Sequence, residues 1–208
     1  MKPYIIFDMD GVIIDSESWY MNQLRNFFVS RGYVIPEKKL EEILGLNTKD
    51  IFDILKEYIN YQGNIQYLFE KYLQELKFPN YQQIVFPNVQ QCIETIFQKN
   101  IDIIIASSSP RKIIKQVLTD LNLDKYILFY MGKEDVKKTK PSPEVYKIIV
   151  RQQKYQKPLF VVEDSTFGIQ AAKMAGLEVV AYYSGKFQNN QSQSDIIITN
   201  HMQLLKLL

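Results

Sequence analysis

Two aspartates lie two positions apart directly after the first apolar run of the chain, in the segment Phe7-Asp8-Met9-Asp10-Gly11. On a continuing strand, residues two apart face the same side, so both carboxylates would face one site. Two carboxylates that share a site repel each other unless a cation or a proton lies between them. The segment therefore predicts a cation or a shared proton at Asp8 and Asp10. The alternative interpretation is an acidic turn that only ends a strand.

Three consecutive serines follow a later apolar run, from Ser107 to Ser109, directly before Pro110. Hydroxyl groups and free backbone N–H groups at the start of a helix form a binding site for anions. Helix capping by Ser109 is the simpler interpretation, but capping requires one serine and leaves Ser107 and Ser108 unexplained. The segment therefore predicts an anion site in addition to a cap.

One lysine and a second pair of acidic residues carry the charges that a site for a cation and an anion would also need. Lys140 precedes Pro141, which disfavours helical geometry at the lysine. A lysine fixed near two aspartates can screen them and bind phosphate, although most lysines are simply solvated. Glu163 and Asp164 end another apolar run, where two adjacent acids are costly unless their charge is compensated. A hard divalent cation with oxygen ligands would compensate them, whereas helix capping by Asp164 or Ser165 explains only one acid.

The elements that must position these groups are apolar runs that alternate with helical patterns. Four runs predict buried strands at residues 4–7, 102–106, 159–162 and 178–182, with further candidates at 195–198 and 127–130. This β-then-α alternation predicts an α/β fold with a parallel sheet covered on both faces. Ligands of such sheets bind beyond the carboxyl ends of the strands, so we expect the polar segments to meet at one edge.

Carboxylates, hydroxyls and a lysine at one edge of a sheet are the groups that phosphoryl transfer requires. The transferred group carries spread negative charge, so catalysis is largely positioning and cationic stabilisation. Mg²⁺ is the expected cofactor because it supplies charge to oxygen ligands and keeps some of its waters.

Local signals mark several helix boundaries. Ser109-Pro110 and Ser142-Pro143 each predict a helix that starts with a serine N-cap and a proline in the first turn. Gly176 predicts the end of the helix that follows Ser165. Asn47 with Asp50 predicts a further helix start.

Residues 16–84 interrupt the α/β pattern. This stretch contains no convincing strand, and its apolar residues recur at helical spacing, as Tyr20, Leu24, Phe27 and Phe28 do. We therefore predict a helical domain at 16–84, inserted into an α/β core domain formed by 1–15 and 85–208.

Composition excludes several classes of protein. The 208 residues include 25 basic and 23 acidic side chains, a net charge of +2 that is too balanced to favour a nucleic-acid or membrane partner. The only histidine is His201, so Ser/His/Asp triads and His-rich metal sites are disfavoured. The single Cys92 is expected to be a small buried filler. The apolar runs are too short to span a membrane. We expect a cytoplasmic monomer.

The four polar segments, in this order, resemble the motifs of the haloacid dehalogenase superfamily of phosphatases and phosphomutases. The likeness spans nearly the whole chain and is nearest to the β-phosphoglucomutase-like branch. It implies a Rossmann-like core with an α-helical cap domain inserted between the first and second motifs. The residues that carry the resemblance are D-x-D-G at 8–11, Ser107, Lys140-Pro141 and Glu163-Asp164-Ser165-x-x-Gly168-Ile169, with the first motif continuing to Glu17.

The resemblance also implies a role for each motif residue. Asp8 is the nucleophile that forms a phosphoaspartate, and Asp10 is the acid and base that serves the leaving and attacking oxygens. Asp8, the backbone carbonyl of Asp10 and Asp164 hold Mg²⁺. Glu163 is either a further ligand or a support for the ligands. The phosphoryl-binding candidates are Ser107, Lys140, Ser108 and Ser109.

The activity and its substrate contacts remain open between alternatives. True β-phosphoglucomutases carry a histidine in the first cap helix and basic residues in a cap loop, where this chain has Trp19-Tyr20 and Leu44 to Lys49. Hydrolysis of a small phosphate monoester, such as a sugar phosphate, is therefore favoured over a β-phosphoglucomutase-type reaction. A non-catalytic protein that binds a phosphorylated metabolite is a third possibility. The candidate cap contacts, which simple packing or surface exposure would also explain, are Trp19, Tyr20, Asn47 and Lys49.

Overall fold

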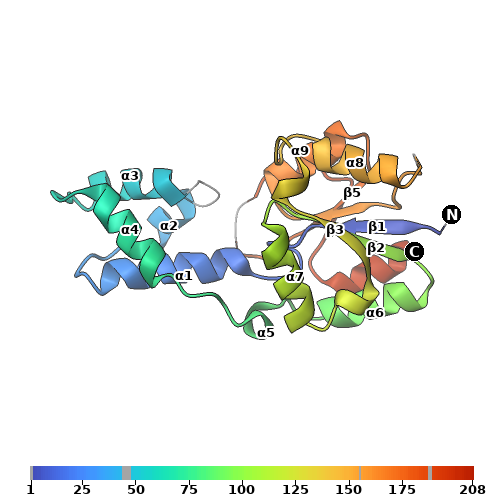
Figure 1. The fold of residues 1–208 in the computed structure, drawn as a ribbon, viewed down its shortest axis with the longest axis horizontal. Coiled ribbons are helices and arrows are strands. Elements are labelled where there is room, and N and C mark those ends of the chain that lie inside the picture. The colour runs from blue at the N-terminus through green and yellow to red at the C-terminus, as the bar shows by residue number, and fades with distance from the viewer. Residues whose placement is uncertain (1, 44–47, 155, 187–188) are drawn as a thin grey trace. The chain divides into compact units, whose positions relative to one another are not determined.

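The computed structural model describes residues 2–43, 48–154, 156–186 and 189–208. The chain divides into two compact units, which Figure 1 shows as ribbons. The first unit consists of Met1–Asp15 with Tyr81–Leu208, and the second consists of Ser16–Asn80.

A six-stranded parallel sheet forms the centre of the first unit, with the strand order β3-β2-β1-β4-β5-β6. The predicted α/β fold with a parallel sheet is confirmed. The strand order reverses between β1 and β4, and the crevice at such a reversal is where ligands bind in open α/β sheets. The strands are β1 (Tyr4–Phe7), β2 (Asp102–Ala106), β3 (Ile127–Met131), β4 (Val161–Glu163), β5 (Val179–Tyr182) and β6 (Ile196–Ile198).

The register of the central strands brings the polar segments together. Phe7 at the end of β1 pairs with Ile105 of β2 and with Val162 of β4. The three strands therefore end nearly level, and the residues that follow them emerge at the same edge of the sheet.

Helices cover both faces of this sheet because alternate strand residues point to opposite sides. Ile5 and Phe7 belong to a core cluster shared with α6, α7 and the C-terminal helix η3, whereas Tyr4 and Ile6 belong to a cluster shared with α8 and α9. Figure 1 shows α8 and α9 on one side of the sheet and α6 on the other. These helices are α5 (Tyr81–Ile84), α6 (Val89–Gln98), α7 (Arg111–Asp120), α8 (Glu144–Gln152), α9 (Thr166–Met174) and the 3₁₀ helices η1 (Asp124–Tyr126), η2 (Lys133–Asp135) and η3 (His201–Leu207).

Two helices start one residue later than the sequence predicts. The N-cap positions of α7 and α8 are occupied by Pro110 and Pro143, with no side-chain cap hydrogen bond, rather than by Ser109 and Ser142. The prediction of a serine cap is therefore wrong for α7, where the hydroxyl of Ser109 is used elsewhere. At α8 the hydroxyl of Ser142 still accepts the backbone N–H of Glu144, the first residue of the helix, at 3.4 Å. The predicted end of α9 at Gly176 is confirmed, since this glycine follows the C-cap residue with a left-handed φ of 72°.

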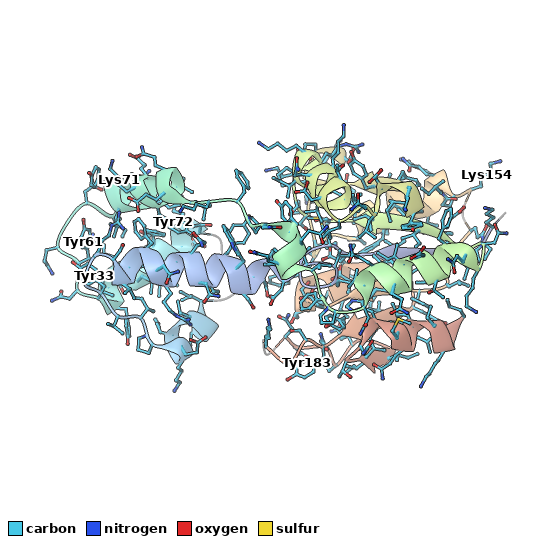
Figure 2. All side chains as sticks on the ribbon, turned by 90° about the horizontal axis from the view of Figure 1, so that it is seen from below. Tyr33, Tyr61, Lys71, Tyr72, Lys154 and Tyr183 are labelled. Carbon is cyan, nitrogen blue, oxygen red and sulfur yellow. The ribbon has the colours of Figure 1, made fainter. Side chains whose placement is uncertain are left out.

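The described residues of the second unit form helices joined by loops, with no strand among them, as the sequence pattern predicts. Its core is rich in aromatic rings, with Phe52 in contact distance of Phe27, Phe28 and Tyr72 at ring-centroid separations of 6.0, 5.5 and 5.3 Å. The rings of Tyr33 and Tyr61, labelled in Figure 2, lie 6.2 Å apart at one end of this unit. The helices are α1 (Ser16–Val29), α2 (Glu37–Glu42), α3 (Thr48–Tyr58) and α4 (Ile65–Glu75).

The insert ends at residue 80 rather than at residue 84, and the difference is the short helix α5. Tyr81 is 4% exposed and packs in a core cluster of the first unit. The carbonyl of Ile84 accepts a 2.7 Å hydrogen bond from the backbone N–H of Asp15. Both interactions tie α5 to the α/β sheet. The helix start predicted at Asn47 lies outside the described residues, and α3 is described from Thr48 onwards.

Cys92 and His201 lie in the interior of the first unit. The thiol of Cys92 is fully buried beside the carbonyl of His201, at 3.1 Å, so the prediction of a buried filler is confirmed. Burial raises the pKa of this thiol to about 12, which leaves it unreactive. Among the described residues, no helix has both the length and the apolar character that crossing a membrane requires.

Candidate active site

Asp8 lies just beyond the end of β1 and is 6% exposed. Its backbone N–H donates to the carbonyl of Val162 at 2.9 Å, which fixes it beside the end of β4. The chain then turns at Gly11, whose φ of 80° is strained for any residue with a side chain. A Cβ atom at Gly11 would lie 2.1 Å from Oδ2 of Asp164, so this position also requires glycine for space.

Lys140 joins the first and last motifs. Its Nζ atom donates to Oδ1 of Asp8 at 2.5 Å, to Oε1 of Glu163 at 2.6 Å and to the carbonyl of Ala106 at 2.8 Å. An ammonium group has three hydrogens, and all three are used here. The side chain is 8% exposed, so Lys140 is not a solvated loop lysine.

Glu163 is the most deeply buried carboxylate of the site, with no exposed surface. Its Oε1 atom accepts from Lys140 and also from the hydroxyl of Tyr146 at 2.6 Å. Its Oε2 atom accepts from the backbone N–H of Asp164 at 3.3 Å. A Cβ atom at Gly168 would lie 2.0 Å from Oε2, so α9 approaches the carboxylate through a glycine. Tyr146 has no place in the sequence-predicted site.

The serine segment meets Asp10. The hydroxyl of Ser109 donates to Oδ2 of Asp10 at 2.7 Å, and that of Ser107 donates to the same oxygen at 3.3 Å. Ser107 also accepts the backbone N–H of Ser109 at 2.9 Å. Ser108 is exposed. The segment therefore places two hydroxyls beside the second motif aspartate.

Asp164 is held by the loop that follows β5. The side-chain amide of Gln191, which is 7% exposed, donates to the carbonyl of Asp164 at 2.7 Å and to the carbonyl of Tyr182 at 2.9 Å. The amide of Asn189 donates to Oδ2 of Asp164 at 3.3 Å. Sequence reasoning missed both amides, because a polar loop after a strand is an ordinary pattern.

The carboxylates form a cluster with the chemistry of a metal site. One oxygen from each of Asp8, Glu163 and Asp164 lies within 4.8 Å of the others. Together with Asp10 they would carry four negative charges when ionised, against one positive charge on Lys140. Oxygen donors at this spacing suit a hard divalent cation. The residues present therefore fit the metal ion that the sequence predicts.

The electrostatics of the cluster without a metal ion show the same need for positive charge. The pKa of Asp8 is raised to about 8, mainly because the carboxyl is buried. The charge of Lys140 opposes this rise in the pKa, and the charges of Glu163 and Asp10 add to it. Burial alone would lower the pKa of Lys140, but the charges of Asp8 and Glu163 outweigh it and raise that pKa well above its ordinary value. Lys140 thus stays charged, and an added cation would keep Asp8 ionised.

The predicted cap contacts belong to the second unit. The rings of Trp19 and Tyr20 meet edge to face, with centroids 5.1 Å apart. Lys49 is exposed in the first turn of α3, and Asn47 lies outside the described residues. Their role in substrate binding stays a prediction.

Comparison with known families agrees with the fold. Residues 5–182 match the profile of the haloacid dehalogenase-like hydrolases, and the chain belongs to this family. It is an enzyme of the phosphatase class, as the named relatives are.

Three relatives illustrate the likeness. A phosphorylated carbohydrates phosphatase from Thermotoga maritima is 31% identical over 84% of this chain and 82% of its own length. A phosphoglycolate phosphatase from Aquifex aeolicus is 23% identical over 98% of this chain and 95% of its own length. The crystal structure of a Thermotoga maritima protein provisionally described as a β-phosphoglucomutase is 25% identical, with a TM-score of 0.79 over 99% of both chains.

Proposed function

We propose that this protein is a Mg²⁺-dependent phosphatase that hydrolyses a small phosphate monoester through a phosphoaspartate on Asp8. The observation that carries the proposal is the position of Lys140, which contacts Asp8 and Glu163 at 2.5 and 2.6 Å inside the acidic cluster. A buried lysine and several carboxylates at one sheet edge are costly for stability. Phosphoryl transfer gives this arrangement a use, because the transferred group needs fixed positive charge and an in-line nucleophile.

The reaction proceeds in two steps. A carboxylate oxygen of Asp8 attacks phosphorus, so that the new oxygen–phosphorus bond forms as the bond to the leaving alkoxide breaks. Asp10 gives its proton to the leaving oxygen. Water then attacks the phosphoaspartate and loses a proton to Asp10, which releases inorganic phosphate and restores both aspartates. The hydrogen bonds from Ser107 and Ser109 orient the Asp10 carboxyl for both transfers.

Positive charge in this reaction has two sources. Lys140 is fixed against Asp8, so its positive charge lies beside the phosphoryl group that arrives there and stabilises the negative charge of that group. Asp8 and Asp164, with the backbone carbonyl of Asp10, would hold Mg²⁺ in the cluster. When bound, Mg²⁺ neutralises negative charge on the carboxylates and on the phosphoryl group.

The proposed substrate class is a phosphorylated carbohydrate of small size. This rests on the 31% identical relative, which is a phosphorylated carbohydrates phosphatase. The phosphoglycolate phosphatases among the relatives act, by their names, on another small phosphate monoester. Both support a small phosphorylated metabolite as the partner of the site.

The direct test measures phosphate release from p-nitrophenyl phosphate and from a panel of sugar phosphates, with Mg²⁺ and with EDTA. Asp8→Asn is expected to lower kcat by at least about 10³-fold without unfolding the protein, because it removes the nucleophile. Asp102→Asn is the matched control, since Asp102 starts β2 at the opposite end of the strands and pairs in register with Tyr4. Equal activity of the Asp8→Asn variant and the wild type would reject the nucleophile.

A phosphomutase is the second candidate, favoured by the full-length likeness to the protein described as a β-phosphoglucomutase. The two reactions differ in whether the phosphoenzyme passes its phosphoryl group to water or to a second sugar hydroxyl. The assay uses β-glucose 1-phosphate with a trace of the 1,6-bisphosphate. Glucose 6-phosphate as the main product identifies a mutase, and free phosphate identifies a phosphatase.

A further inference from the structure

We propose that Tyr146 is a positioning residue of this active site, whose hydroxyl fixes Glu163 and through it holds Lys140 against Asp8. The inference rests on the proposed function, because it assigns a purpose to contacts behind the proposed nucleophile. Tyr146 lies in the first turn of α8, and neither the motifs nor the sequence pattern marks it as more than a core residue.

The contacts form a continuous chain of hydrogen bonds. Tyr146 donates to Oε1 of Glu163 at 2.6 Å, and Lys140 donates to the same oxygen at 2.6 Å. Lys140 then donates to Oδ1 of Asp8 at 2.5 Å. Because a carboxylate only accepts hydrogen bonds, the hydroxyl of Tyr146 must be the donor in its contact.

The position of Glu163 depends on these donors. Tyr146 and Glu163 are both fully buried, so water does not replace a donor that is lost. Oε1 accepts from two donors at 2.6 Å, whereas Oε2 accepts longer hydrogen bonds, from the backbone N–H of Asp164 at 3.3 Å and from the hydroxyl of Ser165 at 3.5 Å. Removal of the Tyr146 hydroxyl leaves Lys140 as the one side-chain donor to Oε1 in the part of the chain that the structure describes. Glu163 is then free to shift, and Lys140, which donates to it at 2.6 Å, shifts with it and away from Asp8.

Packing alone does not account for the hydroxyl. Phenylalanine would fill the same space in the core cluster of α8 and α9 and would avoid placing a polar atom in it. The ring of Tyr146 also lies under Lys140, with Nζ 5.4 Å from the ring centroid, and phenylalanine would keep this contact. The hydroxyl is therefore the part of the residue that acts on the site.

The test compares Tyr146→Phe with a matched control, Tyr4→Phe. Tyr4 is 1% exposed, belongs to the same core cluster and donates its hydroxyl to the carbonyl of Gln156, also at 2.6 Å. It starts β1, at the end of the strand away from the acidic cluster. Both substitutions remove one buried hydroxyl and its hydrogen bond, but only one of them touches Glu163.

Tyr146→Phe is expected to lower kcat for p-nitrophenyl phosphate about 10-fold, with KM changed less than about twofold, because misplaced support for a site usually costs 10- to 100-fold in activity. Tyr4→Phe is expected to keep kcat within about twofold. In a Glu163→Gln background, Tyr146→Phe should lower kcat by less than about twofold, because the residue through which it acts is already altered. Equal kcat values for Tyr146→Phe and Tyr4→Phe, or an undiminished effect in the Glu163→Gln background, would overturn the proposal.

A second measurement separates this proposal from the proposed function. Binding of tungstate, a phosphate analogue, is followed by calorimetry in EDTA, where no turnover or metal ion contributes. A several-fold weaker affinity for Tyr146→Phe than for Tyr4→Phe supports the positioning role even if the wild type fails to hydrolyse any phosphate tested. Should Tyr146→Phe not fold, a crystal structure of the wild type with tungstate decides. A Tyr146 hydroxyl beyond 3.5 Å from Glu163 there contradicts the proposal, and one that keeps its hydrogen bond supports it.

Discussion

The two units of this protein bury different kinds of side chain. The first unit buries Asp8, Glu163 and Asp164 at the edge of its sheet, together with polar residues such as Gln191 and His201. Among the described residues of the second unit, Ser16 is the one buried polar or charged side chain, and the other buried residues are apolar or aromatic. Because buried charges are costly while buried aromatic rings are favourable, the first unit gives up stability at its site, and the second does not.

This difference predicts which substitutions should lower both kcat and the free energy of unfolding, and which should lower only the free energy of unfolding. A buried charged group in the first unit is held by specific partners, so its removal changes both the site and the stability. A buried ring in the second unit is packed against other apolar side chains. Its loss leaves a cavity, which lowers the free energy of unfolding. The predictions below test this contrast from its largest expected consequence to its smallest.

Among the substitutions that compare the two units, Lys140→Met is expected to have the largest effect, because it removes the buried cation between two carboxylates. Loss of fixed positive charge at a phosphoryl site should lower kcat by about 10²–10³-fold. The free energy of unfolding should fall by about 3–5 kcal/mol, the usual consequence of breaking one side of a buried ion pair. Steady-state kinetics and urea denaturation measure the two effects.

Lys147→Met is the matched control for this change. Lys147 lies on α8 and is exposed, so its loss should leave both kcat and the free energy of unfolding nearly unchanged. A wild-type kcat for Lys140→Met would contradict the claim that the buried charges of the first unit serve catalysis.

Phe52→Ala tests the other side of the comparison. The Phe52 side chain is 1% exposed and lies among four aromatic rings, with Phe69 5.4 Å away in addition to those already described. Truncation should lower the free energy of unfolding by about 3–5 kcal/mol through loss of burial and the cavity that remains.

The control for this variant is Tyr67→Ala on α4, whose side chain is 56% exposed, and we expect a change within about 0.5 kcal/mol. Tungstate binding to folded Phe52→Ala protein should match that of the wild type, because the anion contacts proposed here all come from the first unit. A loss of tungstate binding as large as that of Lys140→Met would show that the two units do not divide their roles in this way.

The sequence predicts the sheet and the convergence of the site well, because both depend on local signals. The apolar runs that become β1 and β2 are correct to the residue, and polar residues after parallel strands must share an edge. Tyr146, Asn189 and Gln191 escape prediction for a different reason. Their partners are 17 to 27 residues away in the sequence, and nothing in their own neighbourhoods distinguishes them from a core tyrosine or polar loop residues.

Ser109 shows how a local rule is overridden by tertiary contacts. The sequence predicts that its hydroxyl caps α7, because the N-terminus of that helix is the nearest partner along the chain. In the folded chain Oδ2 of Asp10 accepts the hydroxyl of Ser109 at 2.7 Å, and this tertiary contact holds the serine outside the N-cap position of α7, which Pro110 occupies. The helix consequently begins without a serine cap.

The smallest effect we predict concerns pH and again separates the units. His201 is 1% exposed, and its Nε2 lies 2.8 Å from the carbonyl of Val12. Burial lowers its pKa to about 4 from an ordinary value of 6.5, even though the contact with Val12 raises it in part. A histidine with a lowered folded-state pKa binds protons more readily when unfolded. Its neutral form therefore supports the fold fully above pH 6.5, and this support is lost as the pH falls toward 4.

The difference between the folded-state pKa of about 4 and the ordinary value of 6.5 corresponds to about 3 kcal/mol of the free energy of unfolding, which is lost between these two pH values. His201→Gln keeps an amide that can donate to Val12 and removes the titration, so the variant should lose less stability than the wild type between pH 7 and pH 4.5. Urea denaturation at both pH values measures this difference, and the titration of carboxylates common to both proteins cancels in it. No histidine or carboxylate is among the buried side chains of the second unit's described residues, so the same comparison with Phe52→Ala should show no change in pH dependence. Identical pH dependence of wild type and His201→Gln would contradict the assignment of this acid sensitivity to His201.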